Sequence, residues 1–278
     1  MPAATPGWSA QCYAALSRMV LISIGVFSVW WGVSTFPIFW RDARLDYTAA
    51  SITGGEPFKR ENLETLLAAA ESTERVWARP ESLRSLAIIR LCLAEQSSIV
   101  ENAKPSGPDI DQFGASLRVE NAKPSRLVLD QLDASIRRSL SAAPADPFLW
   151  LALFWSETMK DDWSKKDFAY LRMSYLVGPH EGWVAVRRNY IALENFSALP
   201  QDLAAAAVTE FKNLVKSHFE SAVTLLVGPG RPIQDMLLRR LADVPEEARQ
   251  EFARTAHDQL GYDIAVPGVE RPDPRPWR

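Results

Sequence analysis

The longest apolar run in the chain lies near its start, from Met19 to Trp40, and carries no ionisable side chain. As an α-helix, with a rise of 1.5 Å per residue, this run is roughly 33 Å long, enough to cross a hydrocarbon core of about 30 Å. Tryptophan and phenylalanine gather in its second half, as in the aromatic belt at a membrane surface. The pattern predicts a transmembrane helix over 19–40, preceded by a short tail over 1–18.

Two other interpretations of this run are open. A cleaved signal peptide has a shorter apolar core, of about 7–15 residues, and a cleavage site of small residues. Here the run ends in bulky Phe39 and Trp40, and then in charged Arg41 and Asp42. A buried helix of a soluble protein would show more polar positions on its outer face. We therefore expect an uncleaved anchor that contacts lipid through 19–40.

The charges beside the span give little indication of its orientation. Arg18 precedes it, while Arg41 and Arg44 follow it, so counting basic residues slightly favours a cytoplasmic body. Long domains, however, cross the membrane largely regardless of charge. Because a short tail ahead of a single anchor usually stays inside, we expect a bacterial inner-membrane protein that passes the membrane once, with its body in the periplasm. A cytoplasmic structural or signalling subunit is the alternative.

After the anchor, apolar residues recur every three or four positions, which is typical of amphipathic helices. The pattern lapses over 41–57, where Gly54 and Gly55 indicate a linker. A helical hairpin is expected over 58–98, with Pro80 in the first turn of its second helix, where a missing N–H costs little. The fold class is therefore predicted to be all-α.

The next segment, 99–125, interrupts the helical pattern. The heptapeptide Val100–Ser106 recurs letter for letter as Val119–Ser125, nineteen residues later. That spacing is too short for a repeat of two helices, so we expect an irregular loop with a local duplication. At the other end of the chain we expect a capping hairpin over 228–262 and an extended, Pro-rich tail over 263–278.

A longer period marks the segment 126–227. Two prolines lie 35 positions apart, at 144 and 179, and two tryptophans lie 33 apart, at 150 and 183. Repeats of this length are typical of helical solenoids, in which neighbouring hairpins stack because one hairpin cannot bury its own faces. The residues expected to pack between the helices are Trp150, Leu153, Pro179, Trp183 and Val186.

This pattern resembles the tetratricopeptide-type (TPR) repeat, which has Trp early in its first helix, Leu three residues later and Pro near its end. Trp150, Leu153 and Pro179 match, with one residue inserted, and Trp183, Val186 and Tyr190 match in the second copy. The departures are Phe154, Glu157, Asp167 and Arg187. The resemblance covers 126–217 and implies stacked antiparallel hairpins, a TPR-like solenoid, over 126–227.

The run from Leu171 to Glu181 is similar to a stretch of the VpsP-like group, small anchored proteins near bacterial exopolysaccharide gene clusters. This resemblance implies a helper role in polysaccharide synthesis or export. The implied partners are proteins of a membrane complex, with the polysaccharide machinery among them.

Composition and motifs argue against several classes of function. The net charge of −3 argues against a nucleic-acid partner, which needs a clustered basic face. The three histidines are far apart in the sequence and the two cysteines lie on opposite sides of the span, so we expect no metal site and no cofactor. Glu157, Asp161 and Asp162 lie close together in the sequence, so two of these carboxylates could act as a catalytic pair, although a solvated turn is the favoured interpretation. We expect no enzyme.

The concave face of a helical solenoid is where such proteins bind extended chains. Arginine suits acidic groups, and an ordinary exposed helix face, with the tyrosine in the packing, is the alternative. The candidates for this face are Arg172, Arg187, Arg188 and Tyr190. The sequence thus predicts an anchored helical-repeat adaptor, an accessory of exopolysaccharide synthesis or export. An anchored glycan-binding, peptide-binding or enzymatic domain is the alternative.

Overall fold

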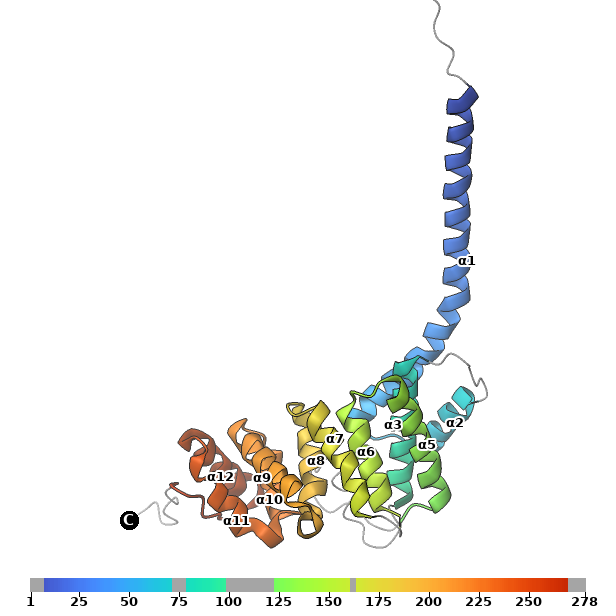
Figure 1. The fold of residues 1–278 in the computed structure, drawn as a ribbon. Coiled ribbons are helices and arrows are strands. Elements are labelled where there is room, and N and C mark those ends of the chain that lie inside the picture. Colours follow the sequence, from blue (N-terminus) through green and yellow to red (C-terminus); the bar gives the residue numbers. More distant parts are fainter. Residues whose placement is uncertain (1–7, 72–78, 99–122, 161–163, 270–278) are drawn as a thin grey trace, which may run out of the picture.

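The computed structural model describes residues 8–71, 79–98, 123–160 and 164–269. Within these ranges the chain forms helices, turns and loops and no strand, so the all-α fold class is confirmed there. One long helix, α1, stands out from an elongated body of shorter helices (Figure 1). The first copy of the duplicated heptapeptide and most of the second lie outside the described residues.

Most consecutive elements are separated by a few residues, whereas the longer segment between α3 and α5, 99–125, lies mostly outside the described residues. The α-helices are α1 (Trp8–Thr53), α2 (Arg60–Glu71), α3 (Pro80–Ser98), α5 (Arg126–Ala142), α6 (Pro147–Thr158), α7 (Phe168–Val177), α8 (Gly182–Glu194), α9 (Gln201–Lys216), α10 (Ser221–Val227), α11 (Gln234–Arg239) and α12 (Glu246–Leu260). Short 3-10 turns are η1 (Lys165–Asp167), η2 (Phe196–Ala198), η3 (Arg231–Ile233) and η4 (Arg240–Asp243).

The first half of α1 carries the apolar run. Its stretch Ala15–Phe36 is long and apolar enough to cross a membrane, and none of it is buried against the body. Val29, for example, is 67% exposed. The span expected from the sequence, 19–40, overlaps this stretch within the same helix. The structure therefore leaves a large apolar surface without a protein partner in the described part of the chain.

The linker expected over 41–57 is wrong over most of its length, because α1 continues to Thr53 and packs against α3. Leu45 and Ala49 are buried on the packed face. Two acidic residues that look solvent-facing in the sequence bind α3 instead: Ser82 Oγ donates to Asp42 at 2.9 Å, and Ser85 Oγ donates to Asp46 at 2.7 Å. The anchor helix is thus part of the body.

The helix α3 lies at the centre of this end of the body. One of its faces packs on α1 and α2, where Leu45, Leu63, Ile89 and Leu93 form a small core. Its other face packs on α5 and belongs to the main core, which continues without a break to the C-terminal segment. The region 58–98 is therefore a three-helix contact that includes α1, instead of a hairpin alone.

Two helix pairs follow, α6–α7 and α8–α9, and each is antiparallel. At the open end of the first pair, a Cβ on Gly178 would lie 2.4 Å from Cγ of Pro147, so only glycine allows this approach. At the open end of the second pair, a Cβ on Gly182 would lie 2.5 Å from Cζ of Phe219. In each pair, the start of the first helix therefore contacts the segment that follows the second helix. Pro147 contacts Gly178 in the first pair, and Gly182 contacts Phe219 in the second.

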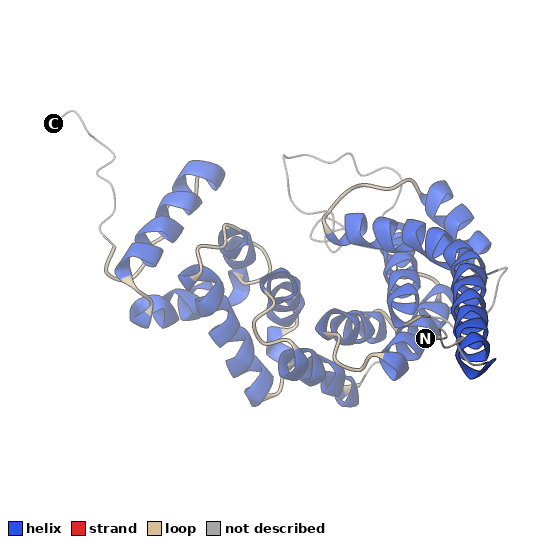
Figure 2. Ribbon diagram, turned by 90° about the horizontal axis from the view of Figure 1, so that it is seen from above, coloured by secondary structure: helices blue, strands red, loops and turns tan. Residues whose placement is uncertain are grey.

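Seen from above, the body forms an arc, with α1 and its neighbours at one end and α12 at the other (Figure 2). The helix α12 is capped by Gly261, which adopts the left-handed conformation with φ of +65° that favours glycine at this position. The segment over 263–278 was expected to be an extended, Pro-rich tail. Ile264 and Val266 are buried, so its first part packs on the core, while 270–278 lies outside the described residues.

The contact between α1 and α3 gives the first testable prediction. Changing Leu45 to Ala should lower the free energy of unfolding of the detergent-solubilised full-length chain by about 2–5 kcal/mol, because it leaves a cavity in a packed site. Leu127→Ala removes the same atoms from a position that is 68% exposed and should change it little. Chemical denaturation measures both. Equal effects of the two changes would show that α1 is not packed as described.

Candidate functional site

The four residues predicted for a concave binding face have different surroundings. Arg172 is exposed at the surface of α7, and its guanidinium binds the carboxylate of Asp202 on α9 at 2.7 and 3.0 Å. Hydrogen bonds from Arg172 lower the pKa of the Asp202 carboxyl below its ordinary value. Arg172 therefore joins two helices at the surface.

Arg188 is fully buried, so it does not line an exposed face as the sequence predicted. Its Nε donates to Glu210 of α9 at 2.9 Å, and its Nη1 donates to the carbonyl oxygen of Ser174 at 2.7 Å. Its Nη2 donates to the carbonyl of Gly178 at 3.2 Å. Burial raises the pKa of the Glu210 carboxyl, and the charge of Arg188 opposes that rise. This one cation connects α7, α8 and α9.

Tyr190 is also buried, with 9% of its surface exposed, and it belongs to the main core. This is the packing role that stood as the alternative in the sequence. Of the four predicted residues, Arg172 and Arg187 are the two that reach the surface.

Arg187 lies among aromatic rings where α3, α6 and α8 meet. Its guanidinium is 5.4 Å from the ring of Phe148 and 5.6 Å from that of Trp183, and the two rings are 5.0 Å apart. On the α3 side of this cluster is Glu95, whose Oε1 is buried without a hydrogen-bond partner among the described residues. Burial raises the pKa of the Glu95 carboxyl to about 8, while the charge of Arg187 acts in the opposite direction.

The predicted repeat-packing residues are not equivalent in the two copies. Trp150 donates its indole N–H to the carbonyl of Pro144 at 2.7 Å and stacks on Tyr170 within its own hairpin, whereas Trp183 contacts Phe148 of the preceding hairpin. Leu153 is fully buried, Val186 is half-buried and Pro179 is exposed. The shared period thus places similar residues in different contacts.

Glu157, proposed above as half of a carboxylate pair, belongs to a network of both charges. It lies 3.0 Å from Nη2 of Arg137 and 3.2 Å from Nζ of Lys160, and Lys160 also binds Asp133 of α5. Burial and the neighbouring Asp133 raise the pKa of the Glu157 carboxyl. Its proposed partners, Asp161 and Asp162, lie outside the described residues. The network cross-links α5 to the end of α6.

The described residues offer no strong chemical centre. They hold no group of three or more histidine, cysteine, aspartate or glutamate side chains that could bind a metal ion. Burial raises the pKa of the Cys92 thiol to about 12, which leaves the thiol protonated and unreactive at neutral pH.

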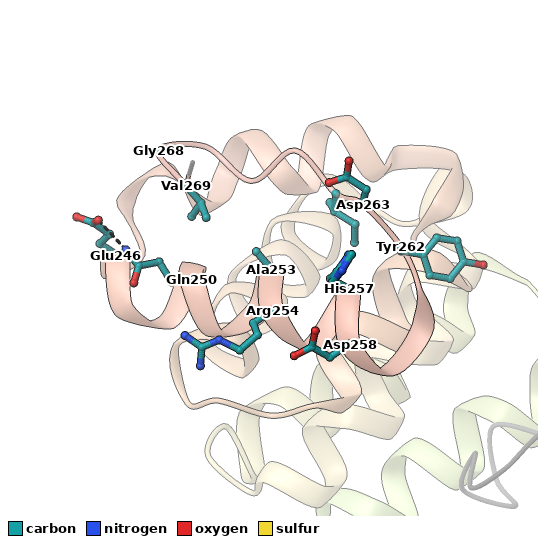
Figure 3. Close-up of a pocket in the computed structure, with 11 residues that line it drawn as sticks. Glu246, Gln250, Ala253, Arg254, His257, Asp258, Tyr262, Asp263, Gly268 and Val269 are labelled. Carbon is teal, nitrogen blue, oxygen red and sulfur yellow. Dashed lines mark hydrogen bonds between the residues drawn. The ribbon is translucent and has the colours of Figure 1, made fainter. Parts of the chain in front are cut away.

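One pocket of about 600 Å³ lies between α12 and the segment that follows it. Its lining mixes acidic side chains with Arg254 and His257. The labelled side chains come from α12 and from the segment after it, and they do not converge on one point (Figure 3). Gln250 Nε2 donates a hydrogen bond of 2.9 Å to the carboxylate of Glu246, one helical turn earlier. This lining does not define a reaction or a ligand.

Comparison with known protein families, with curated proteins and with solved structures finds no match to this chain. The tetratricopeptide-type and VpsP-like resemblances therefore stay predictions. Sequence reasoning missed Glu95, although its place directly after the apolar run Leu91–Ala94 of α3 is a signal that its side chain starts from a buried face.

The buried cation gives a second prediction. Arg188→Met should lower the free energy of unfolding by about 3–5 kcal/mol, because it leaves the Glu210 carboxylate buried without its counter-charge. Arg188→Met combined with Glu210→Met should recover part of that loss. The matched control is Arg172→Met, whose exposed pair should leave the denaturation midpoint nearly unchanged. Indistinguishable midpoints for Arg188→Met and Arg172→Met would refute the network.

Glu95 gives a third, pH-dependent prediction. Its carboxyl pKa is raised from an ordinary 4.5 to about 8, so the folded protein binds this proton more tightly than the unfolded chain does. The free energy of unfolding should therefore fall as pH rises from about 4.5 to about 8. Glu95→Gln should remove this part of the fall, whereas exposed Glu247→Gln should keep it. Parallel pH profiles for the native chain and Glu95→Gln would contradict the assignment.

Proposed function

We propose that this protein is a membrane-anchored helical scaffold, whose body holds partner proteins beside the membrane. The observation that carries the proposal is the division of α1 into two parts. The body buries no part of Ala15–Phe36. Later turns of the same helix, which include Ala49, are packed into the core. An exposed apolar surface of that length is stable in lipid and promotes aggregation in water.

The packing of α1 supports an anchor over a cleaved signal. Cleavage just after Trp40 would start the mature chain inside a helix, next to the buried residues Asp42 and Leu45. It would also remove Phe39, whose ring centre lies 4.7 Å from the guanidinium carbon of Arg79, the residue just before α3. Cleavage at this point would therefore remove contacts that stabilise the body.

The body supports binding over catalysis. Its charged clusters join helices through pairs of opposite charge: Arg188 binds Glu210, and Arg137 and Lys160 bind the carboxylates of Glu157 and Asp133. Its hairpins, α6–α7 and α8–α9, share the close approach at their open ends, which favours a stack of the tetratricopeptide type. An arc of side-by-side helices offers a long surface for partners.

The likeness of Leu171–Glu181 to VpsP-like proteins directs this proposal to a bacterial inner membrane, a periplasmic body and the machinery of exopolysaccharide synthesis or export. Part of that stretch also has a role in packing. Ser174 Oγ donates to the carbonyl of Pro147 at 2.8 Å, and Gly178 lies against the same proline. The functional assignment of the stretch therefore depends on partner identification.

The fourth prediction tests the scaffold in cells. The full-length chain should stay with membranes through an alkaline carbonate wash and, after cross-linking, co-purify with proteins of a membrane complex. Val26→Arg with Val29→Arg should release it and lose those proteins, since each Arg at the centre of a span costs about 2.5–3.5 kcal/mol. The control places arginines at Leu127 and Leu176, exposed positions of the body.

Two results would overturn the proposal. If the full-length protein washes off membranes, the proposed anchor is refuted. If the anchored protein cross-links to no partner, the proposed scaffold role is refuted. A C-terminal reporter that is active only outside the cytoplasm gives the orientation. Activity is expected, and inactivity of a stably produced fusion would place the body in the cytoplasm.

A further inference from the structure

A groove of about 760 Å³ lies between α1 and α2, just beyond the apolar stretch of α1. Trp40, Arg44 and Tyr47 of α1 form one wall, and Phe58 and Leu66, before and on α2, contribute to the other. The groove is formed at the place where the anchor helix enters the body, and its walls continue the apolar surface of the anchor.

The chemistry of the lining matches a phospholipid. Trp40 and Tyr47 are each 69% exposed, and Phe58 and Leu66 are half-buried, so the walls present apolar surface to whatever fills the groove. Arg44 is the one charged side chain among the described residues that line it, and no carboxylate lines it. Apolar walls with a single guanidinium suit a molecule that joins an acyl chain to a phosphate, because guanidinium binds phosphate oxygens well.

The position of the groove matches the headgroup layer. Arg44 lies about 6 Å and Tyr47 about 10 Å beyond Trp40 along a helix that rises 1.5 Å per residue. The headgroup layer is roughly 5–8 Å thick on each side of the hydrocarbon core. Because α1 turns aside where it reaches the body, its later turns move away from the membrane by less than their length along the axis (Figure 1). Trp and Tyr are the residues enriched at this level.

We propose that this groove binds a phospholipid of the membrane that α1 crosses. The lipid phosphate lies at Arg44, and the upper carbons of an acyl chain lie against Trp40, Phe58 and Leu66. The inference rests on the proposed anchor and adds to it a defined lipid site. It also means that the α1–α2 end of the body lies against the bilayer in one orientation, since α1 continues into the body as helix.

The test uses the full-length chain in vesicles of phosphatidylethanolamine and phosphatidylglycerol, with Cys12 and Cys92 replaced by Ala. A fluorophore is attached to one introduced cysteine at a time: at Thr65 in the groove, at Val29 in the span, or at Asp258 on α12 at the far end of the arc. Quenching is measured with lipids brominated near the headgroup or deep in the acyl chain. Shallow bromines should quench the label at 65, deep bromines the label at 29, and neither the label at 258.

The outcomes separate this inference from the anchor itself. No quenching at 29 would refute the anchor, whereas quenching at 29 without quenching at 65 would refute the lipid site alone. Signal at 65 that changes with the protein-to-lipid ratio, and not with bromination, would assign the groove to a second copy of the chain and overturn the proposal.

Variants of the groove provide the second measurement. Arg44→Glu should reduce quenching at 65 several-fold and leave quenching at 29 unchanged, because it replaces the cation that meets the phosphate. Arg44→Lys keeps the charge and should retain most of the signal. Equal quenching at 65 in the native chain, Arg44→Glu and Arg44→Lys would show that no phosphate is held at Arg44.

Discussion

The constraint on which the structure depends is that one helix has two environments. Over Ala15–Phe36 every side of α1 is left uncovered by the body, while a few residues later Leu45 and Ala49 are buried and Asp42 and Asp46 accept hydrogen bonds from α3. The α-helix continues from one part to the other, although Pro37 between them has no N–H to donate to the preceding turn. Any orientation of the apolar half therefore fixes the orientation of the body, since no flexible linker separates them.

Within the body, the corresponding constraint is the placement of one buried charge. A guanidinium removed from water is stable only if it finds a counter-charge and enough acceptors. Arg188 finds them in Glu210 of α9 and in the carbonyls of Ser174 and Gly178 at the end of α7, where the helix dipole also favours a cation. Sliding α7 or α9 past α8 would separate these partners. The relative position of the hairpins is thus specified by charge as well as by apolar packing.

The sequence predicted the helices well because their evidence is local. Apolar spacing marks each packed face, and proline and glycine mark the breaks. It failed over 41–57, where Asp42 and Asp46 have the appearance of a solvated linker, because their partners Ser82 and Ser85 lie about forty positions later. Local patterns carry no information on such pairs.

Two of the four candidate binding residues, Arg188 and Tyr190, are buried, and for Arg188 the reason is the same. An arginine is mostly exposed unless it is paired, and the acid that makes burial of Arg188 possible lies on another helix, 22 positions away. The period of 33–35 residues was real in the sequence, yet Trp150 and Trp183 contact different neighbours. A repeat in spacing identifies candidate hairpins, and only the packing shows whether they are equivalent.

The direction of the arc gives the proposed scaffold its geometry. The body extends to one side of α1 instead of along its axis (Figure 1), so with α1 upright in a bilayer the hairpins are arranged along the membrane surface. A flexible linker would let partners sample many distances and lower the effective concentration of each arrangement. The continuous helix α1 removes that freedom. Partners on successive hairpins would then be held at similar heights above the lipid, which suits an assembly whose other subunits lie in the same membrane.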